Sequence, residues 1–117
     1  MEIDYFSSEE FNCCIPSCSK EQMDKGFMQR LNKARRLAGL PFILNSAYRS
    51  SEYDMRKGRS GNSYHCKGRA VDIKCLDSSS RAVIVSALIS CGFRGIGIGN
   101  TFVHVDDRPI KCMWLYE

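Results

Sequence analysis

The sequence lacks any long hydrophobic run. Its longest apolar stretch, residues 82–91, is interrupted by Ser86 and Ser90, whereas a helix that crosses a membrane needs about 18 to 20 consecutive apolar residues. Residues 1–5 are acidic and have neither the basic start nor the apolar segment of a signal peptide. We therefore expect a soluble protein that is cytoplasmic at synthesis and has no membrane partner.

A strong excess of charge of one sign is absent as well. The 117 residues carry 17 Lys and Arg against 13 Asp and Glu, which gives a net charge of +4. The basic residues are scattered rather than gathered in a stripe with aromatic platforms, so we expect no nucleic-acid partner. A chain of this length buries one core and not two. We expect a single domain, residues 1–117, and a monomer.

Cysteine is abundant for a cytosolic chain but too rare for a disulfide-rich scaffold. The seven cysteines stand at positions 13, 14, 18, 66, 75, 91 and 112. Because the count is odd, at least one thiol is unpaired. The C-C-x3-C spacing near the N-terminus has no second half, so it indicates a structural zinc site only weakly. Buried thiols and one local disulfide are the alternative explanations.

Two segments have the pattern of helices. A capping box at residues 19–22 precedes apolar residues that recur at steps of three and four over 23–37, and Gly39 supplies the stop. The second helix is expected over 81–91, with the serines at 78–80 as candidate N-caps and a glycine directly after it. Both segments should pack an apolar face against a core.

Short strands are expected at residues 42–48, 69–74, 94–99, 101–106 and 111–116. In the second of these, Asp72 projects from the face opposite Val71 and Ile73. Residues 49–63 are polar and are predicted as a loop with one helical turn around 52–57. The order of elements predicts an α+β fold, a small antiparallel sheet with helices packed on it.

The strand at 94–99 alternates glycine with isoleucine. This alternation predicts that the isoleucines pack into the core and that something approaches the backbone closely on the glycine side. An extended peptide and a crowded neighbouring strand explain the glycines equally well.

Histidine is scarce, and the two histidines of the chain, His65 and His104, stand beside or within predicted strands. Catalytic zinc sites use three protein ligands of imidazole and carboxylate type and leave the fourth position to water. The two histidines and Asp72 would supply that set. The alternative is a pair of unrelated histidines on the surface or in the core.

The residues around His65 carry a specific pattern. The motif S-x-H-x2-G-x-A-x-D is met in full by Ser63, His65, Gly68, Ala70 and Asp72. Here the chain resembles the zinc-dependent D-Ala-D-Ala carboxypeptidases and their relatives among phage endolysins, vancomycin-resistance D,D-dipeptidases and the hedgehog signalling domain. Residues 46–50, 102–106 and 6–11 resemble further segments of the family, so the resemblance covers nearly the whole chain.

This resemblance implies roles for individual residues. His65, Asp72 and His104 would bind Zn²⁺ on the open face of the sheet. Arg49 would steady the carbonyl oxygen as it becomes an oxyanion. Tyr48 belongs to the same segment and is a candidate for substrate binding.

Two further positions leave their roles open. Ser63 would either bind substrate or hold the loop. Several relatives carry an acid or a histidine three positions before the last zinc ligand, where this chain has Thr101. Asp106 points to the same strand face as His104 and is our candidate general base. It would otherwise orient the His104 imidazole.

The residues support three functional hypotheses. The first is a zinc metallopeptidase that hydrolyses peptidoglycan stem peptides, at D-Ala-D-Ala or at a nearby bond such as L-Ala-D-Glu. If it is phage-encoded, such a protein would reach the wall after phage lysis or entry; a bacterial cytoplasmic dipeptidase is the alternative. The second is a catalytically silent zinc-containing cell-wall-binding module. The third is a small redox or metal-storage protein that uses Cys13, Cys14 and Cys18.

Overall fold

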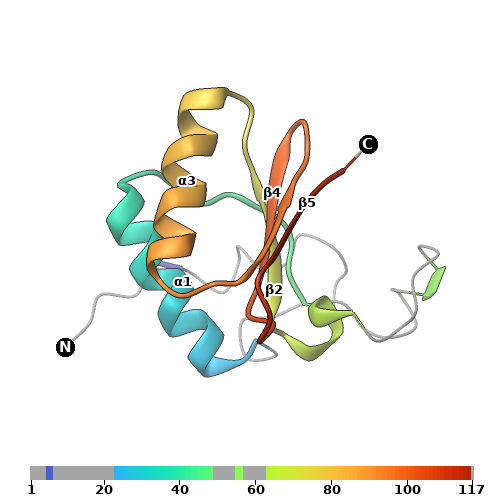
Figure 1. Ribbon diagram of the computed structural model, residues 1–117. Coiled ribbons are helices and arrows are strands. Elements are labelled where there is room, and N and C mark those ends of the chain that lie inside the picture. The colour runs from blue at the N-terminus through green and yellow to red at the C-terminus, as the bar shows by residue number, and fades with distance from the viewer. Residues whose placement is uncertain (1–4, 7–22, 49–54, 57–62, 117) are drawn as a thin grey trace.

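The computed structural model describes residues 5–6, 23–48, 55–56 and 63–116 (Figure 1). Two helices, one 3-10 turn and five strands make up the described chain: α1 (Lys25–Ala38), β1 (Leu44–Ser46), η3 (Tyr64–Lys67), β2 (Ala70–Lys74), α3 (Ser78–Ser90), β3 (Gly95–Ile98), β4 (Phe102–Asp106) and β5 (Cys112–Leu115). The predicted α+β fold is therefore confirmed. Of the helical turn expected at 52–57, residues 55 and 56 are helical, and the others lie outside the described residues.

Helix α1 begins later than its sequence pattern suggested. Its N-cap is Asp24, whose carboxylate accepts a hydrogen bond from the backbone N–H of Phe27 at 2.9 Å. The capping box at 19–22 lies outside the described residues and precedes this cap. The helix ends at Gly39, whose φ of 68° is the left-handed conformation that glycine adopts without strain.

Helix α3 is capped by Asp77 and not by one of the serines at 78–80. The two carboxylate oxygens of Asp77 accept from the Ser80 backbone N–H at 2.7 Å and from the Ser80 hydroxyl at 3.0 Å. A serine in the same place has only one side-chain oxygen to offer, so the aspartate one residue earlier starts the helix three residues before its expected beginning. No helix in the described ranges is long and apolar enough to span a membrane.

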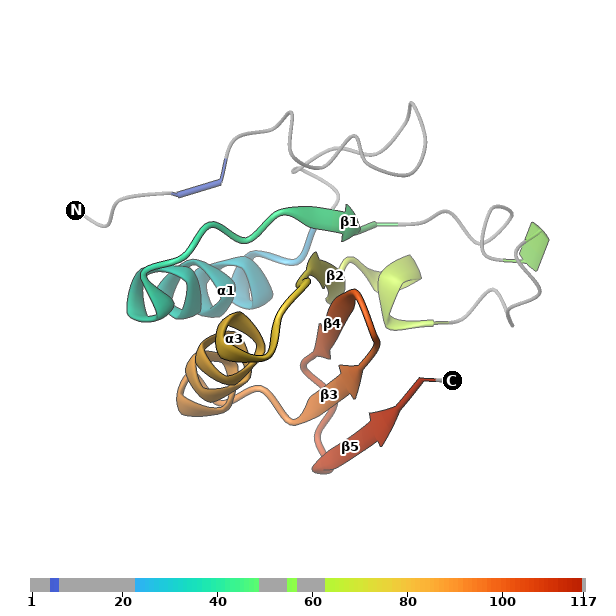
Figure 2. The same ribbon diagram turned by 90° about the horizontal axis from the view of Figure 1, so that it is seen from above.

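The five strands form one sheet in the order β1-β2-β4-β3-β5. All neighbouring pairs are antiparallel except β3 and β5, which run parallel. The expectation of an antiparallel sheet is thus met except at this edge. After the β3–β4 hairpin the chain crosses to the outer side of β3, and β5 pairs there as the edge strand (Figure 2).

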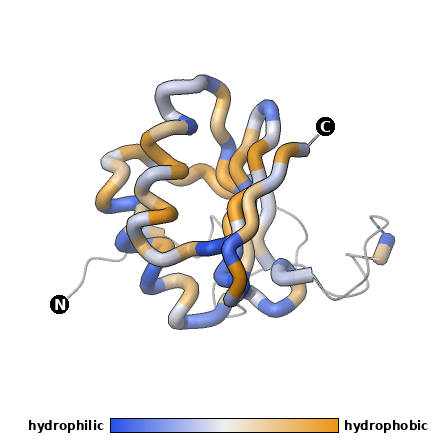
Figure 3. The backbone as a smooth tube through the Cα atoms, in the orientation of Figure 1, coloured by the Kyte–Doolittle hydropathy of each residue, from blue (hydrophilic) through white to orange (hydrophobic). Residues whose placement is uncertain are grey.

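The two faces of the sheet differ in their cover. Both helices lie on the same side (Figure 2), and they bury the apolar side chains Val71, Ile73, Val103 and Val105, each fully enclosed. Burying an aliphatic side chain of this size contributes about 1.5–3 kcal/mol. Figure 3 colours much of the sheet and of α3 as hydrophobic. Neither α1 nor α3 covers the opposite face, and Asp72 projects from it (Figure 2).

Candidate metal centre

The pairing of the strands places the polar residues of the open face in one row. Asp72 on β2 lies opposite His104 on β4, His104 lies opposite Gly97 on β3, and Gly97 lies opposite Trp114 on β5. Residues directly opposite one another on neighbouring strands point to the same face of a sheet. The row therefore brings Asp72 and His104 together although they stand 32 residues apart.

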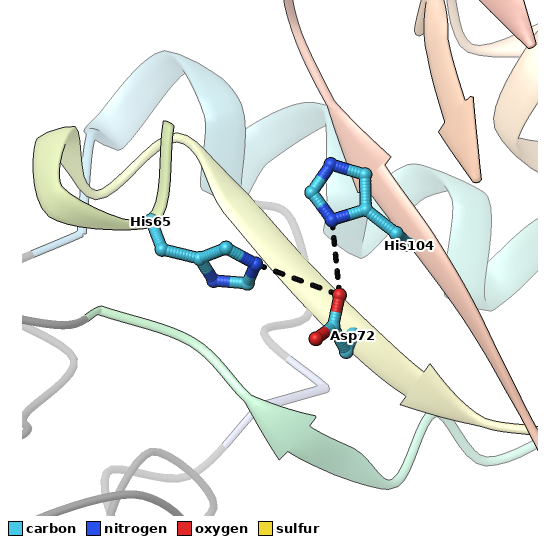
Figure 4. Close-up of side chains that lie close together, drawn as sticks. All are labelled: His65, Asp72 and His104. Atoms are coloured by element: carbon cyan, nitrogen blue, oxygen red, sulfur yellow. Dashed lines mark hydrogen bonds and ion pairs between the residues drawn. The ribbon is translucent and has the colours of Figure 1, made fainter. Parts of the chain in front are cut away.

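His65 reaches this row from η3, beside β2. The turn ends at Gly68, whose φ of 69° lets the chain reverse into the strand. The Nδ1 atom of His65 lies 2.7 Å from the carbonyl oxygen of Ala47. Because a carbonyl only accepts, Nδ1 carries the proton and donates it. In the neutral imidazole the other nitrogen, Nε2, carries the lone pair, and it lies 3.5 Å from Asp72 Oδ1 (Figure 4).

His104 is held from both sides. Its Nδ1 lies 3.0 Å from Asp72 Oδ1, and its Nε2 lies 2.7 Å from Asp106 Oδ2. Asp106 is fully buried and forms an ion pair with Arg108, so it is an ionised acceptor for an Nε2 proton. In the neutral imidazole this leaves Nδ1 as the nitrogen that faces Asp72 with a lone pair.

These atoms suit a metal ion. One ligand atom from each of His65, Asp72 and His104 lies within 4.8 Å of the others, and within the described residues this is the one such group of His, Cys, Asp and Glu side chains. Tetrahedral zinc with bonds of about 2 Å needs ligand atoms about 3.5 Å apart. The contacts of Asp72 with the two imidazoles are already that short. Three protein ligands leave one position open, as in catalytic rather than structural zinc sites.

The charges of the centre balance one another. Burial works against ionisation of Asp72, but the hydrogen bonds that His104 and His65 donate to it in their protonated forms outweigh burial and lower the pKa of the carboxyl. Burial likewise disfavours the charged form of His104, yet its hydrogen bonds with Asp106 and Asp72 raise its pKa overall. Asp72 is therefore anionic at neutral pH and supplies the negative charge that a divalent cation requires.

The centre lies at one side of a cleft of about 350 Å³. Besides the His–Asp–His group and Asp106, the cleft is lined by Ser63, Tyr64, Phe102, Arg108, Trp114 and Tyr116. Three of these are aromatic side chains of β4, of β5 and of the residue after β5, and they contact one another: the ring centroids of Phe102 and Tyr116 are 4.9 Å apart, and those of Trp114 and Tyr116 are 6.1 Å apart. They form an aromatic wall beside the candidate ligands.

The glycines of β3 make room for this wall and for Arg108. A Cβ on Gly97 would lie 2.6 Å from the Tyr116 ring and 2.7 Å from the Trp114 indole nitrogen. Of the two explanations offered for the glycine-isoleucine pattern, close approach by neighbouring segments of the chain accounts for it. The side chains that cover the glycines are the protein's own, so these glycines do not lie open to a peptide.

The other predicted site residues are placed as follows. Ser63 lines the cleft, and its hydroxyl lies 3.6 Å from the Cys66 sulfur. Tyr48 is half-buried and packs against the core, and it is not among the residues that line this cleft. Arg49 lies outside the described residues. Thr101 is exposed and precedes β4.

Arg108 and the aromatic wall were not predicted from the sequence. Trp114 is the single tryptophan of the chain, and Arg108 follows Asp106 by two residues, but neither fact places them beside a metal site. The position of Trp114 depends on the pairing of β5 with β3, which no local pattern encodes, and Arg108 lies in the segment between β4 and β5. The cysteines play no part in the described centre: Cys66, Cys75, Cys91 and Cys112 are free thiols, and the three N-terminal cysteines lie outside the described residues.

A His–Asp–His centre with an open position, placed beside a cleft on the free face of a small α+β sheet, is typical of a zinc hydrolase. Comparison with known protein families agrees with this class. The family model for Peptidase M15 matches residues 4–106, and the chain belongs to this family of zinc-dependent peptidases. No curated protein matches the chain. The family match includes the His–Asp–His group and ends before Arg108 and Trp114.

Proposed function

We propose that the protein hydrolyses peptide bonds in the stem peptides of peptidoglycan, at D-Ala-D-Ala or at a nearby bond such as L-Ala-D-Glu. His65, Asp72 and His104 would hold the zinc ion through Nε2, Oδ1 and Nδ1. The observation that carries the proposal is the convergence of these three donors at a cleft in a chain of the M15 family. Bound zinc supplies a Lewis acid and a water of lowered pKa.

The residues of the chain would prepare this chemistry. The carbonyl of Ala47 fixes the His65 ring, and Asp106 fixes the His104 ring, so in their neutral forms both imidazoles present an unprotonated nitrogen without turning. Arg49 would steady the developing oxyanion, and Ser63, which lines the cleft, would contact the substrate. Of the two roles considered for Asp106, we assign it the orientation of His104. Its carboxylate is fully buried, and both of its oxygens already have partners.

The proposed substrate agrees with the charge of the protein. A net charge of +4 favours an anionic partner such as the bacterial wall, although it does not select one. We propose that the protein acts on the wall after phage lysis or entry, as the endolysins that it resembles do. A monomer without nucleic-acid or membrane partners suffices for this work.

A second candidate function is a catalytically silent zinc module that binds the cell wall. Two observations favour it. Asp106 is engaged by His104 and Arg108, and Thr101 stands where several relatives carry an acid or a histidine. Without a carboxylate able to take a proton from water, turnover would be slow and zinc would serve stability.

The two candidates differ in one measurement. Purified protein is analysed for zinc and incubated with muropeptides, whose masses are then recorded for the wild type, His65→Ala and Lys74→Ala. Lys74 is exposed on the same strand as Asp72 and serves as the matched control. Cleavage products from the wild type and the control alone support the peptidase. Bound zinc with unchanged masses supports the silent module. Absence of zinc from the wild type would overturn both.

A further inference from the structure

The guanidinium group of Arg108 holds the carboxylate that holds His104. Its Nε donates to Asp106 Oδ1 at 2.8 Å and its Nη2 donates to Oδ2 at 2.7 Å. The backbone N–H of the same residue also donates to Oδ1, at 3.2 Å. Such a two-pronged pair fixes the plane of the carboxylate as well as its charge. Asp106 Oδ2 is the atom that accepts from His104 Nε2, so Arg108 sets the direction of that hydrogen bond.

The same guanidinium contacts both sides of the metal centre. Its central carbon lies 4.6 Å from the centroid of the Trp114 ring and 5.3 Å from that of Tyr64. Trp114 packs against His104 with ring centroids 5.3 Å apart, and Tyr64 directly precedes His65 in η3. Arg108 therefore connects η3, which carries His65, with Trp114, which packs against His104.

The sheet leaves space for this arrangement at one position. Gly95 lies opposite Asp106, and a Cβ built there would overlap Asp106 Oδ1 and lie 2.6 Å from Arg108 Nε. Any larger residue would push the ion pair away from the strand. The Asp106–Arg108 ion pair thus lies directly against the backbone of β3, which limits how closely the pair approaches the sheet.

We infer that Arg108 is a positioning residue of the metal centre. It keeps His104 in the tautomer that presents Nδ1, and it fixes the spacing of His65 and His104 for one ion. The inference rests on the proposed metal site and adds a residue beyond the end of the family match. Partners that orient metal-binding imidazoles typically change metal affinity about 10- to 100-fold when they are removed.

A neighbouring ion pair provides the matched control. Arg69 donates through Nε to both carboxylate oxygens of Asp107, at 2.8 and 3.1 Å, and its guanidinium lies 5.9 Å from the Tyr64 ring. The chemistry is that of the Arg108 pair, one residue further along the chain. No hydrogen bond or ion pair joins Asp107 to either histidine among the described residues. Loss of Arg69 therefore removes a similar ion pair without touching the ligands.

The test measures zinc affinity by competition with a chelating dye for the wild type, Arg108→Gln, Arg108→Lys and Arg69→Gln. We expect Arg108→Gln to bind zinc about 10- to 100-fold more weakly. Arg108→Lys keeps the charge but cannot span both oxygens, so it should also lose affinity, more than Arg69→Gln does. Arg69→Gln should stay close to the wild type. Thermal melts report whether each variant is folded.

A second readout concerns the tautomer directly. Long-range ¹H–¹⁵N spectra of the metal-free protein, at a pH where both imidazoles are neutral, resolve the two histidines of the chain. The wild type and Arg69→Gln should show the Nε2–H form of His104, and Arg108→Gln and Arg108→Lys a mixture. Should Arg108→Gln fail to fold, Arg108→Lys carries the test.

The outcomes separate the inference from the function on which it rests. If the wild type binds zinc and the folded Arg108 variants bind it equally well, or keep the His104 tautomer unchanged, the positioning role is overturned while the metal site stands. If the wild type itself binds no zinc at His65 and His104, the proposed function fails, and this inference fails with it.

Discussion

The helix-covered face and the open face of the sheet take their residues from the same strands in alternation, yet they are built differently. On β2, Val71 and Ile73 enter a dry apolar core, while Asp72 between them points to the cleft. On β4, Val103 and Val105 enter the core on either side of His104. A shift of one residue in either strand would exchange the two environments.

The covered face supplies most of the stability, and the open face carries the groups for metal binding. The covered face gains free energy from removing apolar area from water, so its residues are replaceable by others of similar size. The open face buries His104 and Asp106 as deeply, but each of them has a specific partner there. Substitutions on the covered face should therefore reduce stability, and substitutions on the open face should reduce metal binding.

The largest expected effect tests the open face. Asp72→Ala removes the carboxylate between the two imidazoles. With one of three ligands gone, we expect bound zinc to fall far below one equivalent. A bound metal contributes several kcal/mol of transition-state stabilisation, so peptide hydrolysis should drop about 10³-fold. Metal analysis and muropeptide digestion check this, with a cooperative thermal melt as the test of folding. A variant that keeps its zinc would remove Asp72 from the ligand set.

Ile73, the next residue of β2, should show the reverse: a loss of stability without a loss of zinc. Ile73→Ala leaves a cavity in the covered face, where this side chain is fully enclosed. We expect unfolding to become easier by about 2–5 kcal/mol. Urea denaturation measures this change, and the folded variant should still bind zinc as the wild type does. If Ile73→Ala lost zinc while remaining folded, the separation between the two faces would be wrong.

A smaller effect is expected where the aromatic wall touches β3. In Gly97→Ala the new methyl group meets the rings of Trp114 and Tyr116, which must move outward. We expect a destabilisation of about 1–3 kcal/mol, typical of overpacking. Trp114 is the single tryptophan, so its fluorescence reports the displacement directly. Gly26→Ala, in the first turn of α1, is the control and should leave this fluorescence unchanged.

The smallest expected effect lies outside both faces, at the N-cap of α3. Hydrogen bonds from the backbone N–H and the hydroxyl of Ser80 lower the pKa of Asp77. The stabilisation of the folded protein by the ionised Asp77 is therefore complete above the pKa of about 3.9 that this carboxyl has in the unfolded chain. It is lost as the pH falls through the lower pKa of the folded state. Asp77→Asn keeps an accepting oxygen but does not titrate, so its melting temperature should fall less steeply in acid than that of the wild type. An equal acid dependence would contradict the cap.

Much of the covered face could be predicted from the sequence because its signal is local. The alternation of Val71, Asp72 and Ile73 fixes which side chains enter the core once the segment is a strand. The caps were harder to predict. Aspartate competes with the adjacent serines for the same backbone donors, and Asp77 starts α3 where 78–80 were expected to do so. The parallel pairing of β5 was not predictable, since it depends on a crossover.

The candidate site likewise contains residues that could be predicted from the sequence and residues that could not. His65, Asp72 and His104 could be singled out because histidine is rare in the chain and the motif around His65 is specific. The structure brings these three together as the motif suggested. Trp114 could not be found, because it approaches the centre through the pairing of β5 with β3. Arg108 could not be found, because an arginine two residues after an aspartate does not by itself indicate an ion pair beside a metal site. Arg49 stays a prediction.

Two parts of the chain form the cleft: the segments that carry the donor atoms, and the parallel edge strand β5 with the residue after it. The donor atoms are complete by residue 104, whereas Trp114 and Tyr116 are encoded after the end of the family match. Replacing the side chains of Trp114 and Tyr116 would therefore change what the cleft admits while leaving the three donor residues and the Arg108–Asp106 pair in the chain.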